Sequence, residues 1–350
     1  MLKWIRALSI SFLFISVLGT IQLISNFSLS SKDEALHVSV YNDFLDLEMI
    51  ESFTKETGIK VHLHFYNANE ELLTKIQFSK GEGLDILIPS DYACKILADK
   101  GFLQPIDKSR LNFLDRIYPF LLDRTFDPKN IYSIPYSWEA YGIVYDPQWI
   151  KQKEFFISDY FNPSYTKVMT PDFIEATTIA AYHLFQDKGS LTDQEVQKVS
   201  NLLREQNQTV TAYADFRSKD ILSSKSAEIA VIKTSFLDAI KAINPGLEFS
   251  LTKDKFFASI ENVVILKNSK KIDHIYTFLN YIYKPENLAL TVNLFPCYPS
   301  CADTFNEPND HEQIYFDVIK EIESRPDDMR LFYYVTEPDK GRNIFIESKT

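Results

Sequence analysis

Two carboxylates, Asp172 and Glu175, stand three residues apart in the segment VMTPDFIEATTIAAYHLF, where a helix is expected to begin. Aspartate at a helix N-cap followed by glutamate is close to a capping box, in which Asp172 accepts a backbone N–H and Glu175 reaches back. Both acids also suit the positive end of the helix dipole. The alternative is that they face a cleft and hold a cation. A carboxylate has several lone pairs, so the two roles are compatible.

Composition and charge narrow the classes of protein to which the chain can belong. It has 350 residues, of which 45% are hydrophobic and 14% are aromatic, enough for two packed domains rather than a disordered chain. The formal net charge is -11 without a run of basic residues. Nucleic-acid binding needs clustered lysine and arginine, so we expect no nucleic-acid partner. An acidic surface favours cationic or neutral partners, although it also serves solubility.

The N-terminus has the layout of an export signal, with Lys3 and Arg6 before an apolar run from Ala7 to about Ile24. Residues 1–30 are therefore predicted to be a signal peptide or an N-terminal anchor, which places the remainder in the periplasm. The run is close to the minimum for a membrane span and no A-x-A cleavage site follows it, so an uncleaved inner-membrane anchor stays open. No cysteine lies near its end, and a lipoprotein is not expected.

Strands and helices alternate after the signal. The order is strand ALHVSVYND, helix LEMIESFTKETG, strand IKVHLHFYN, helix NEELLTKIQFSKGEG and strand LDILIPSDY. This pattern predicts an open α/β sheet, and a second βα series follows from residue 168. The stretch IYSIPYSWEAYGIVYDPQWI is interpreted as a weakly helical crossover, and the segment from ENVVILK onward as a strand, a turn and one long helix. Ligands bind at the carboxyl ends of such strands, which directs attention to the loops YNDFLD, YNANE and PSDYA.

Several blocks resemble the spermidine/putrescine-binding proteins of bacterial ABC importers over most of residues 36–300: DILIPSDYACKILADKGFLQPIDKSRLNFLDRI, FDPKNIYSIPYSWEAYGIVYD and YFNPSYTKVMTPD. FTKETGIKV is common to many solute-binding proteins, whereas IPSDY followed by IPYSW and TPDFIE is more specific. The resemblance fades after Cys301. It implies a type II periplasmic-binding-protein fold, in which two α/β lobes close around one ligand. The expected lobe 1 is 36–139 with 261–300, and lobe 2 is 140–260 with 301–345.

The resemblance also implies a set of ligand-binding residues. In that family the polyamine lies between the lobes, with its methylenes against aromatic rings and its ammonium groups on carboxylates. A desolvated ammonium needs a paired acid, and an aromatic face adds about 0.5 to 2 kcal/mol. The positions here that correspond to the family's ligand-binding residues are Phe44, Ser90, Tyr92, Asp172, Glu175 and Glu261. Asp43, which stands where the family has a tryptophan, is a further candidate for ligand binding.

Two other aromatic positions of the family are lost, because Lys233 and Ser259 stand where tryptophans are expected. An ammonium fixed beside a polyamine repels it by a few kcal/mol at about 4 Å and an effective dielectric constant of about 20. Lys233 would then pair with Glu175 or Glu261, point into solvent, or belong to a site for another ligand. It could clamp a zwitterion such as an amino acid or short peptide, or replace one ammonium of a longer ligand and leave room for a diamine.

Other motifs give weaker signals. His62 and His64 share one face of a strand, but no carboxylate or cysteine in that segment completes a metal site. Cys297 and Cys301 could form a disulfide if a turn brings their Cα atoms within about 7 Å. Tyr281 and Tyr283 are assigned to core packing. The sequence contains no G-x-S-x-G motif, P-loop or H-E-x-x-H motif, so we expect neither an enzyme nor a cofactor.

These observations predict an exported, monomeric solute-binding component of an ABC importer. Its partners would be a small cationic ligand, a polyamine, and a membrane permease. Two alternatives stay open: binding of another small molecule such as an amino acid or peptide, and a non-transport anchored surface or sensor protein whose cleft has decayed.

Overall fold

The computed structural model describes residues 34–350 except 216, 296 and 306–312. The signal or anchor expected at residues 1–30 lies outside the described part of the chain. Within the described residues, no helix is both long enough and apolar enough to cross a bilayer.

Strands from both ends of the chain join in one curled sheet in the order β2-β1-β3-β9-β4-β7-β5-β6, with β10 and β8 added beside β4 and β11 beside β9. The pairs β1/β2, β1/β3, β5/β6 and β5/β7 are parallel, whereas β4 and β9 run antiparallel to each other. The strands are β1 (Leu36–Tyr41), β2 (Val61–Tyr66), β3 (Ile86–Leu87), β4 (Ser133–Tyr145), β5 (Lys167–Met169), β6 (Val210–Tyr213), β7 (Ile229–Lys233), β8 (Glu248–Ser250), β9 (Phe256–Ile265), β10 (Tyr298–Pro299) and β11 (Met329–Leu331).

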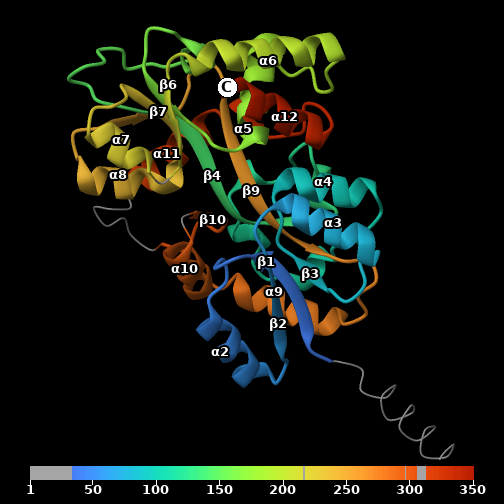
Figure 1. Ribbon diagram of the computed structural model, residues 1–350. Helices are drawn as coiled ribbons and strands as arrows, with labels where there is room; N and C mark the ends of the chain where they lie inside the picture. Colours follow the sequence, from blue (N-terminus) through green and yellow to red (C-terminus); the bar gives the residue numbers. More distant parts are fainter. Residues whose placement is uncertain (1–33, 216, 296, 306–312) are drawn as a thin grey trace, which may run out of the picture.

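Helices cover this sheet in two groups, and Figure 1 shows the resulting two lobes, one below the other. The first lobe holds β1–β3 with α2 (Leu47–Thr57), α3 (Asn69–Ser79), α4 (Asp91–Asp99), α9 (Ile272–Ile282) and α10 (Pro285–Leu294). The second lobe holds β5–β8 with α5 (Phe173–Phe185), α6 (Asp193–Asn207), α7 (Ser218–Ser223), α8 (Leu237–Ile243) and α12 (Pro338–Ser348). Helix α11 (Gln313–Ser324) precedes β11. The predicted two-lobed α/β fold is confirmed.

Local sequence explains the first βαβ unit. The side chain of Asp46 accepts the Met49 N–H and caps the start of α2. Gly58 ends the same helix in the left-handed conformation at φ 74°, which a residue without Cβ adopts at little cost. The buried face of α2 carries Met49, Ile50 and Phe53, whose spacing puts them on one side of a helix.

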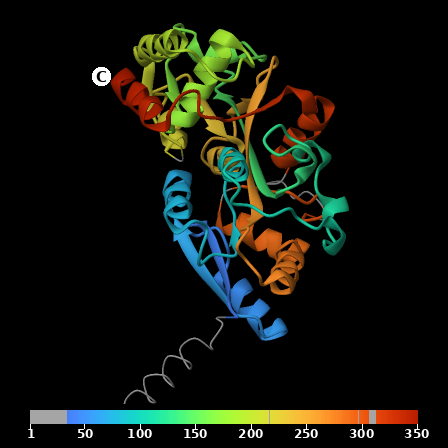
Figure 2. The ribbon, with the colours of Figure 1, turned by 90° about the vertical axis from the view of Figure 1, so that its right-hand side faces the viewer.

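Two long strands, β4 and β9, connect the lobes, and Figure 2 shows them running from one lobe into the other. The interpretation of the β4 sequence as weakly helical was wrong, although it does cross between the lobes. It is rich in Tyr, Ile and Val, which suit a pleated and buried surface, and almost all of its residues are buried. The single long helix expected after β9 was also wrong, because Pro285 begins a separate helix, α10.

The cysteines and the paired tyrosines are structural. Cys94, Cys297 and Cys301 are all buried and free, so the considered Cys297–Cys301 disulfide is not formed. Tyr281 and Tyr283 are 8% and 0% exposed, which confirms their assignment to core packing. The Tyr283 ring stacks on Phe113 at 3.9 Å between centroids.

The connection between β4 and β8 depends on a residue without a side chain. A Cβ atom on Gly142 would lie 2.4 Å from the Phe249 ring and 2.6 Å from the Ser250 carbonyl oxygen. We expect Gly142→Ala to lower the free energy of unfolding by about 1 to 3 kcal/mol, measured by urea denaturation, because the backbone itself must move. Gly246→Ala is the control, since its Cβ would meet only Asn244 Oδ1 at 3.4 Å. Equal effects of the two substitutions would contradict this expectation.

Candidate ligand cleft between the lobes

A cavity of about 220 Å³ lies where the two lobes meet β4 and β9. Five carboxylates and one ammonium group line it, together with aromatic rings and small polar groups. Its lining residues are Tyr41, Phe44, Asn67, Ala68, Asn69, Glu70, Ser90, Tyr92, Ser137, Trp138, Glu139, Asp172, Ile174, Glu175, Lys233, Ser259, Glu261, Phe295, Cys297 and Phe332.

Most of the residues selected from the sequence are brought together here. The cavity lining includes Phe44, Ser90, Tyr92, Asp172, Glu175, Lys233 and Glu261. Asp43 is not among the lining residues. It is exposed, has a left-handed backbone at φ 58°, and accepts a hydrogen bond from the Asn42 side chain at 2.9 Å.

Ser90 joins the first lobe to β9. It is the N-cap residue of α4, but its hydroxyl makes no cap hydrogen bond and instead donates to Glu261 Oε1 at 2.6 Å. The Asn69 side chain donates to Ser90 Oγ at 2.9 Å and accepts the Ser90 N–H at 3.2 Å. This chain of hydrogen bonds fixes Glu261 in the cleft.

The two acids at the start of α5 have separate tasks. Asp172 caps the helix, because its Oδ1 accepts the N–H groups of Ile174 and Glu175 at 2.7 and 3.1 Å. Glu175 does not reach back, so the expected reciprocal capping box is not formed. Its carboxylate accepts hydrogen bonds from the Tyr141 and Thr170 hydroxyls, and the residue as a whole is 8% exposed.

Lys233, at the end of β7, points into the same group of acids. Its ammonium lies 3.0 Å from Glu139 Oε1 and 3.4 Å from Glu175 Oε1. Of the arrangements left open by the sequence, pairing with Glu175 is the one observed, and Glu139 is a second partner. Burial alone would lower the pKa of Lys233, but Glu139 and Glu175 outweigh it and hold this pKa well above its usual range.

Sequence reasoning missed Glu139 and Glu70 as members of the site. Glu139 was expected only as the last residue of the first segment of lobe 1. The register of β4 against β9 pairs Ser137 with Glu261 and Glu139 with Ser259, so alternate β4 residues face the cleft. Glu70 lies in the YNANE loop, which had been selected, but no acid was assigned there. A prediction of β4 as a strand would have revealed Glu139.

Glu70 also connects the lobes through tyrosines. Its Oε1 accepts the Tyr334 hydroxyl at 2.5 Å and the Tyr92 hydroxyl at 3.4 Å. The two rings pack edge to face, with centroids 5.3 Å apart. Tyr334 follows β11 in the segment that crosses the molecule between α11 and α12 (Figure 2). This contact joins the first lobe to the C-terminal segment.

Aromatic side chains form the wall of the cavity on the first-lobe side. Phe44 is 1% exposed and packs on Tyr136 and Phe295, with ring centroids 5.7 and 5.1 Å apart. Tyr41 is 36% exposed and meets Phe295 edge to face at 5.6 Å. Such a wall suits the methylene groups of a ligand, whose burial contributes about 0.8 kcal/mol each.

Two carboxyls in the cleft are harder to ionise than usual. Burial raises the pKa of Glu261 to about 7, despite the hydrogen bond from Ser90 that favours the ionised form. Burial, and then the charge of Glu175, raise the pKa of Asp172 to about 7. Asp172 as a whole residue is exposed, and it also lines the cavity. A cation between these groups would favour their ionised forms.

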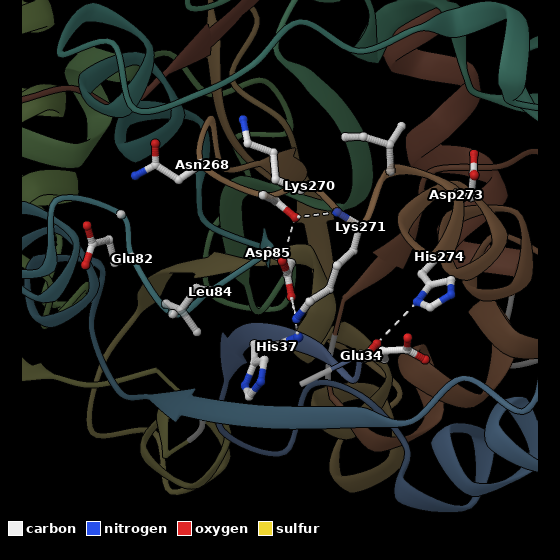
Figure 3. Close-up of a pocket in the computed structure, with 14 residues that line it drawn as sticks. Glu34, His37, Glu82, Leu84, Asp85, Asn268, Lys270, Lys271, Asp273 and His274 are labelled. Carbon is white, nitrogen blue, oxygen red and sulfur yellow. Dashed lines mark hydrogen bonds and ion pairs between the residues drawn. The ribbon is translucent and has the colours of Figure 1, made fainter. Parts of the chain in front are cut away.

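A larger hollow of about 1020 Å³ lies in the first lobe, away from the cleft, and is drawn in Figure 3. Its lining contains no Phe, Tyr or Trp. The central acid is already satisfied, because Asp85 accepts hydrogen bonds from Lys271 Nζ at 3.0 Å, Ser269 Oγ at 2.5 Å and the His37 N–H at 2.9 Å. The chemistry therefore favours the smaller cavity as the ligand site.

The histidines of β2 do not assemble a metal site. Among the described residues, no group of three or more His, Cys, Asp and Glu side chains is placed to hold a metal ion. His64 Nε2 lies 2.9 Å from His37 Nδ1, and burial lowers the pKa of His64.

Two α/β lobes around an acidic, aromatic cleft define a solute-binding protein of the periplasmic type. Residues 39–289 match the family model described as bacterial extracellular solute-binding protein. The chain belongs to this family.

Relatives of known name fit this assignment. The spermidine/putrescine-binding periplasmic protein of Salmonella typhimurium is 24% identical over 289 residues, covering 82% of this chain and 81% of that protein. The putrescine/agmatine-binding protein of Pseudomonas aeruginosa is 25% identical over 305 residues, covering 80% and 82%. The crystal structure of a spermidine/putrescine ABC transporter substrate-binding protein from Streptococcus pneumoniae aligns with a TM-score of 0.71 and 24% identity, covering 91% and 99%. The type II periplasmic-binding-protein fold implied by the sequence resemblance is confirmed.

Without ligand, the raised pKa of Glu261 makes the free energy of unfolding depend on pH. The folded protein holds this proton up to about pH 7, whereas the unfolded chain releases it near pH 4.5. Stability therefore falls as pH rises through this window. We expect Glu261→Gln to remove this loss of stability. The free energy of unfolding of the variant minus that of wild type should therefore increase by about 1 to 2 kcal/mol between pH 5 and pH 8.

Urea denaturation in amine-free buffer measures this difference. Asp99→Asn is the control, because Asp99 is exposed and paired with Lys95 outside the cleft. A difference between Glu261→Gln and wild type that does not change with pH would contradict the expectation.

Proposed function

We propose that the protein is the substrate-binding component of an ABC importer and that it holds a small polyamine in the interlobe cleft. The observation that supports this most is the excess of carboxylates over ammonium groups in a cavity with aromatic walls. A desolvated carboxylate needs a paired charge or a proton, and a cationic ligand supplies the charge. The names of the relatives point to the same class of ligand.

Asp172 and Glu261 are the primary acceptors in this proposal. Among the described residues, Asp172 Oδ2 and Glu261 Oε2 receive no hydrogen bond, while the other oxygen of each acid is held by the protein. The acids are thus oriented before the ligand arrives, and preorganised groups lose less entropy on binding. Phe44, Tyr41 and Tyr92 would flank the methylenes.

Closure would use the crossing strands. We place the boundaries between the lobes at residues 139/140, 260/261 and 300/301, with hinges near Glu139 to Gly142, Glu261 and Cys301. A ligand that touches both lobes stabilises the closed form, and a permease partner would recognise that form. In this proposal the protein acts as a monomer in the periplasm and is a carrier rather than an enzyme.

A zwitterionic ligand is less well supported. A ligand carboxylate would need the Lys233 ammonium, which already has two carboxylate partners within 3.4 Å. Exchanging either partner would leave a desolvated acid without its counter-ion.

Calorimetric titration with putrescine and spermidine tests the proposed ligand class. We expect wild type to bind at least one of the two amines, and Asp172→Asn and Glu261→Gln each to weaken that binding about tenfold or more, because each removes a charge-assisted hydrogen bond. Asp99→Asn should bind as wild type does. No heat with either amine, or unaltered affinity in both cleft variants, would overturn the proposal.

The proposal also sets the pH dependence of binding. The amines stay protonated below about pH 9, whereas Asp172 and Glu261 must release protons with pKa values of about 7. Affinity should therefore increase from pH 5.5 to pH 8, with protons released on binding. Titration in two buffers of different ionisation enthalpy measures this release. A pH-independent affinity would show that these acids do not face the ligand.

A further inference from the structure

Lys233 and its neighbours form a closed group on the second-lobe side of the cleft. Its ammonium contacts Glu139 and Glu175 and lies 5.6 Å from the centroid of the Tyr141 ring. Ser235 donates to the second oxygen of Glu139 at 2.7 Å, and the Tyr141 and Thr170 hydroxyls donate to the two oxygens of Glu175. Every carboxylate oxygen in this group therefore has a partner from the protein.

The closed group is also largely removed from water. The side chains of Lys233, Glu139 and Glu175 are 22%, 15% and 11% exposed. A ligand ammonium that displaced Lys233 would leave this lysine desolvated and unpaired. An ammonium placed beside Lys233 would meet a repulsion of the same order as the attraction of one carboxylate at equal distance. The group formed by Lys233, Glu139 and Glu175 thus has no vacancy for a cation.

Open acceptor oxygens remain only on cavity-lining acids outside this closed group. Among the cavity-lining acids, those that keep an oxygen without a hydrogen-bond donor from the described residues are Glu70, Asp172 and Glu261. Glu70 is already engaged through its other oxygen with Tyr334 and Tyr92. The cavity of about 220 Å³ is also smaller than the roughly 300 to 1,000 Å³ of common ligand sites. Both the open acceptors and the space suit a short ligand.

We propose that Lys233 is a built-in cation that occupies the part of the cleft beside Glu139 and Glu175 and makes the protein selective for a short diamine, with putrescine bound in preference to the longer triamine spermidine. The inference rests on the proposed polyamine function. Lys233 acts here as a specificity-determining residue, because its ammonium takes the position that a further ammonium of a triamine would need.

Replacing the lysine by an uncharged side chain of similar length tests this role. We expect wild type to bind putrescine at least about tenfold more tightly than spermidine at pH 7.5. In Lys233→Met the affinity for spermidine should rise about tenfold or more, since Glu139 and Glu175 become free to receive its additional ammonium. The affinity for putrescine should rise less than that for spermidine, so that the preference for putrescine falls by more than about threefold. Calorimetric titration of both amines against each variant gives these ratios.

Two matched variants separate charge from packing. Lys233→Arg keeps the positive charge and should keep the preference for putrescine. Lys233→Met combined with Glu139→Gln removes the ammonium and one of its acids, so its affinity for spermidine should lie between those of wild type and Lys233→Met. If Lys233→Met alone folds poorly, the double variant still tests the inference, because it leaves only one carboxylate without the lysine. Circular dichroism and thermal unfolding establish that each variant is folded.

The outcomes distinguish this inference from the proposed function. Equal affinity of wild type for both amines, or an amine ratio that Lys233→Met leaves within about threefold of wild type, would overturn the role of Lys233 while amine binding stands. Loss of putrescine binding in folded Lys233→Met would also overturn it. No binding of either amine by wild type and Lys233→Met would overturn the proposed function itself.

Discussion

Like charges brought together in a partly dry space are the constraint on which this structure depends. Glu70, Glu139, Asp172, Glu175 and Glu261 all line one small cavity, and water is scarce around several of them. Removing a carboxylate from water is unfavourable unless another charge, hydrogen bonds or a proton compensates. The cleft uses all three forms of compensation, and the acids differ in which of them they use.

The division follows the architecture. Glu139 and Glu175 are compensated by Lys233 and by hydroxyl groups, and these residues lie in β4, β7 and α5 or directly after β5 and β7. Asp172 and Glu261 have donors for one oxygen only and have pKa values of about 7. The two strands that connect the lobes carry an acid each, so a change in the angle between the lobes alters the surroundings of Glu139 and Glu261 directly. In the proposed function, ligand binding and lobe closure are coupled through the same backbone.

Some acids of the cleft are compensated by the protein itself, and others keep an oxygen available for a ligand. This division also explains how one fold can serve different ligands. The two lobes, the crossing strands and the N-terminus of α5 provide a general frame. Specificity then depends on which acids the protein satisfies internally and which it leaves for the ligand. At Lys233 the chain departs from the resemblance seen in its sequence, and the departure lies at the centre of the site rather than on the surface.

The sequence by itself determined the two-lobed α/β fold and most residues of the cleft. Its βαβ periodicity is local, and the resemblance selected Ser90, Tyr92, Asp172, Glu175 and Glu261, all of which line the cavity. Only the tertiary structure decided how the charges are partnered. The pairing of Lys233 with Glu139 depends on the register of β4 beside β7, and the contact of Glu70 with Tyr334 joins residues 264 positions apart. No local pattern records such distances, because a side chain's partners are set by strand register and lobe packing, whereas periodicity reports only which face of an element is buried.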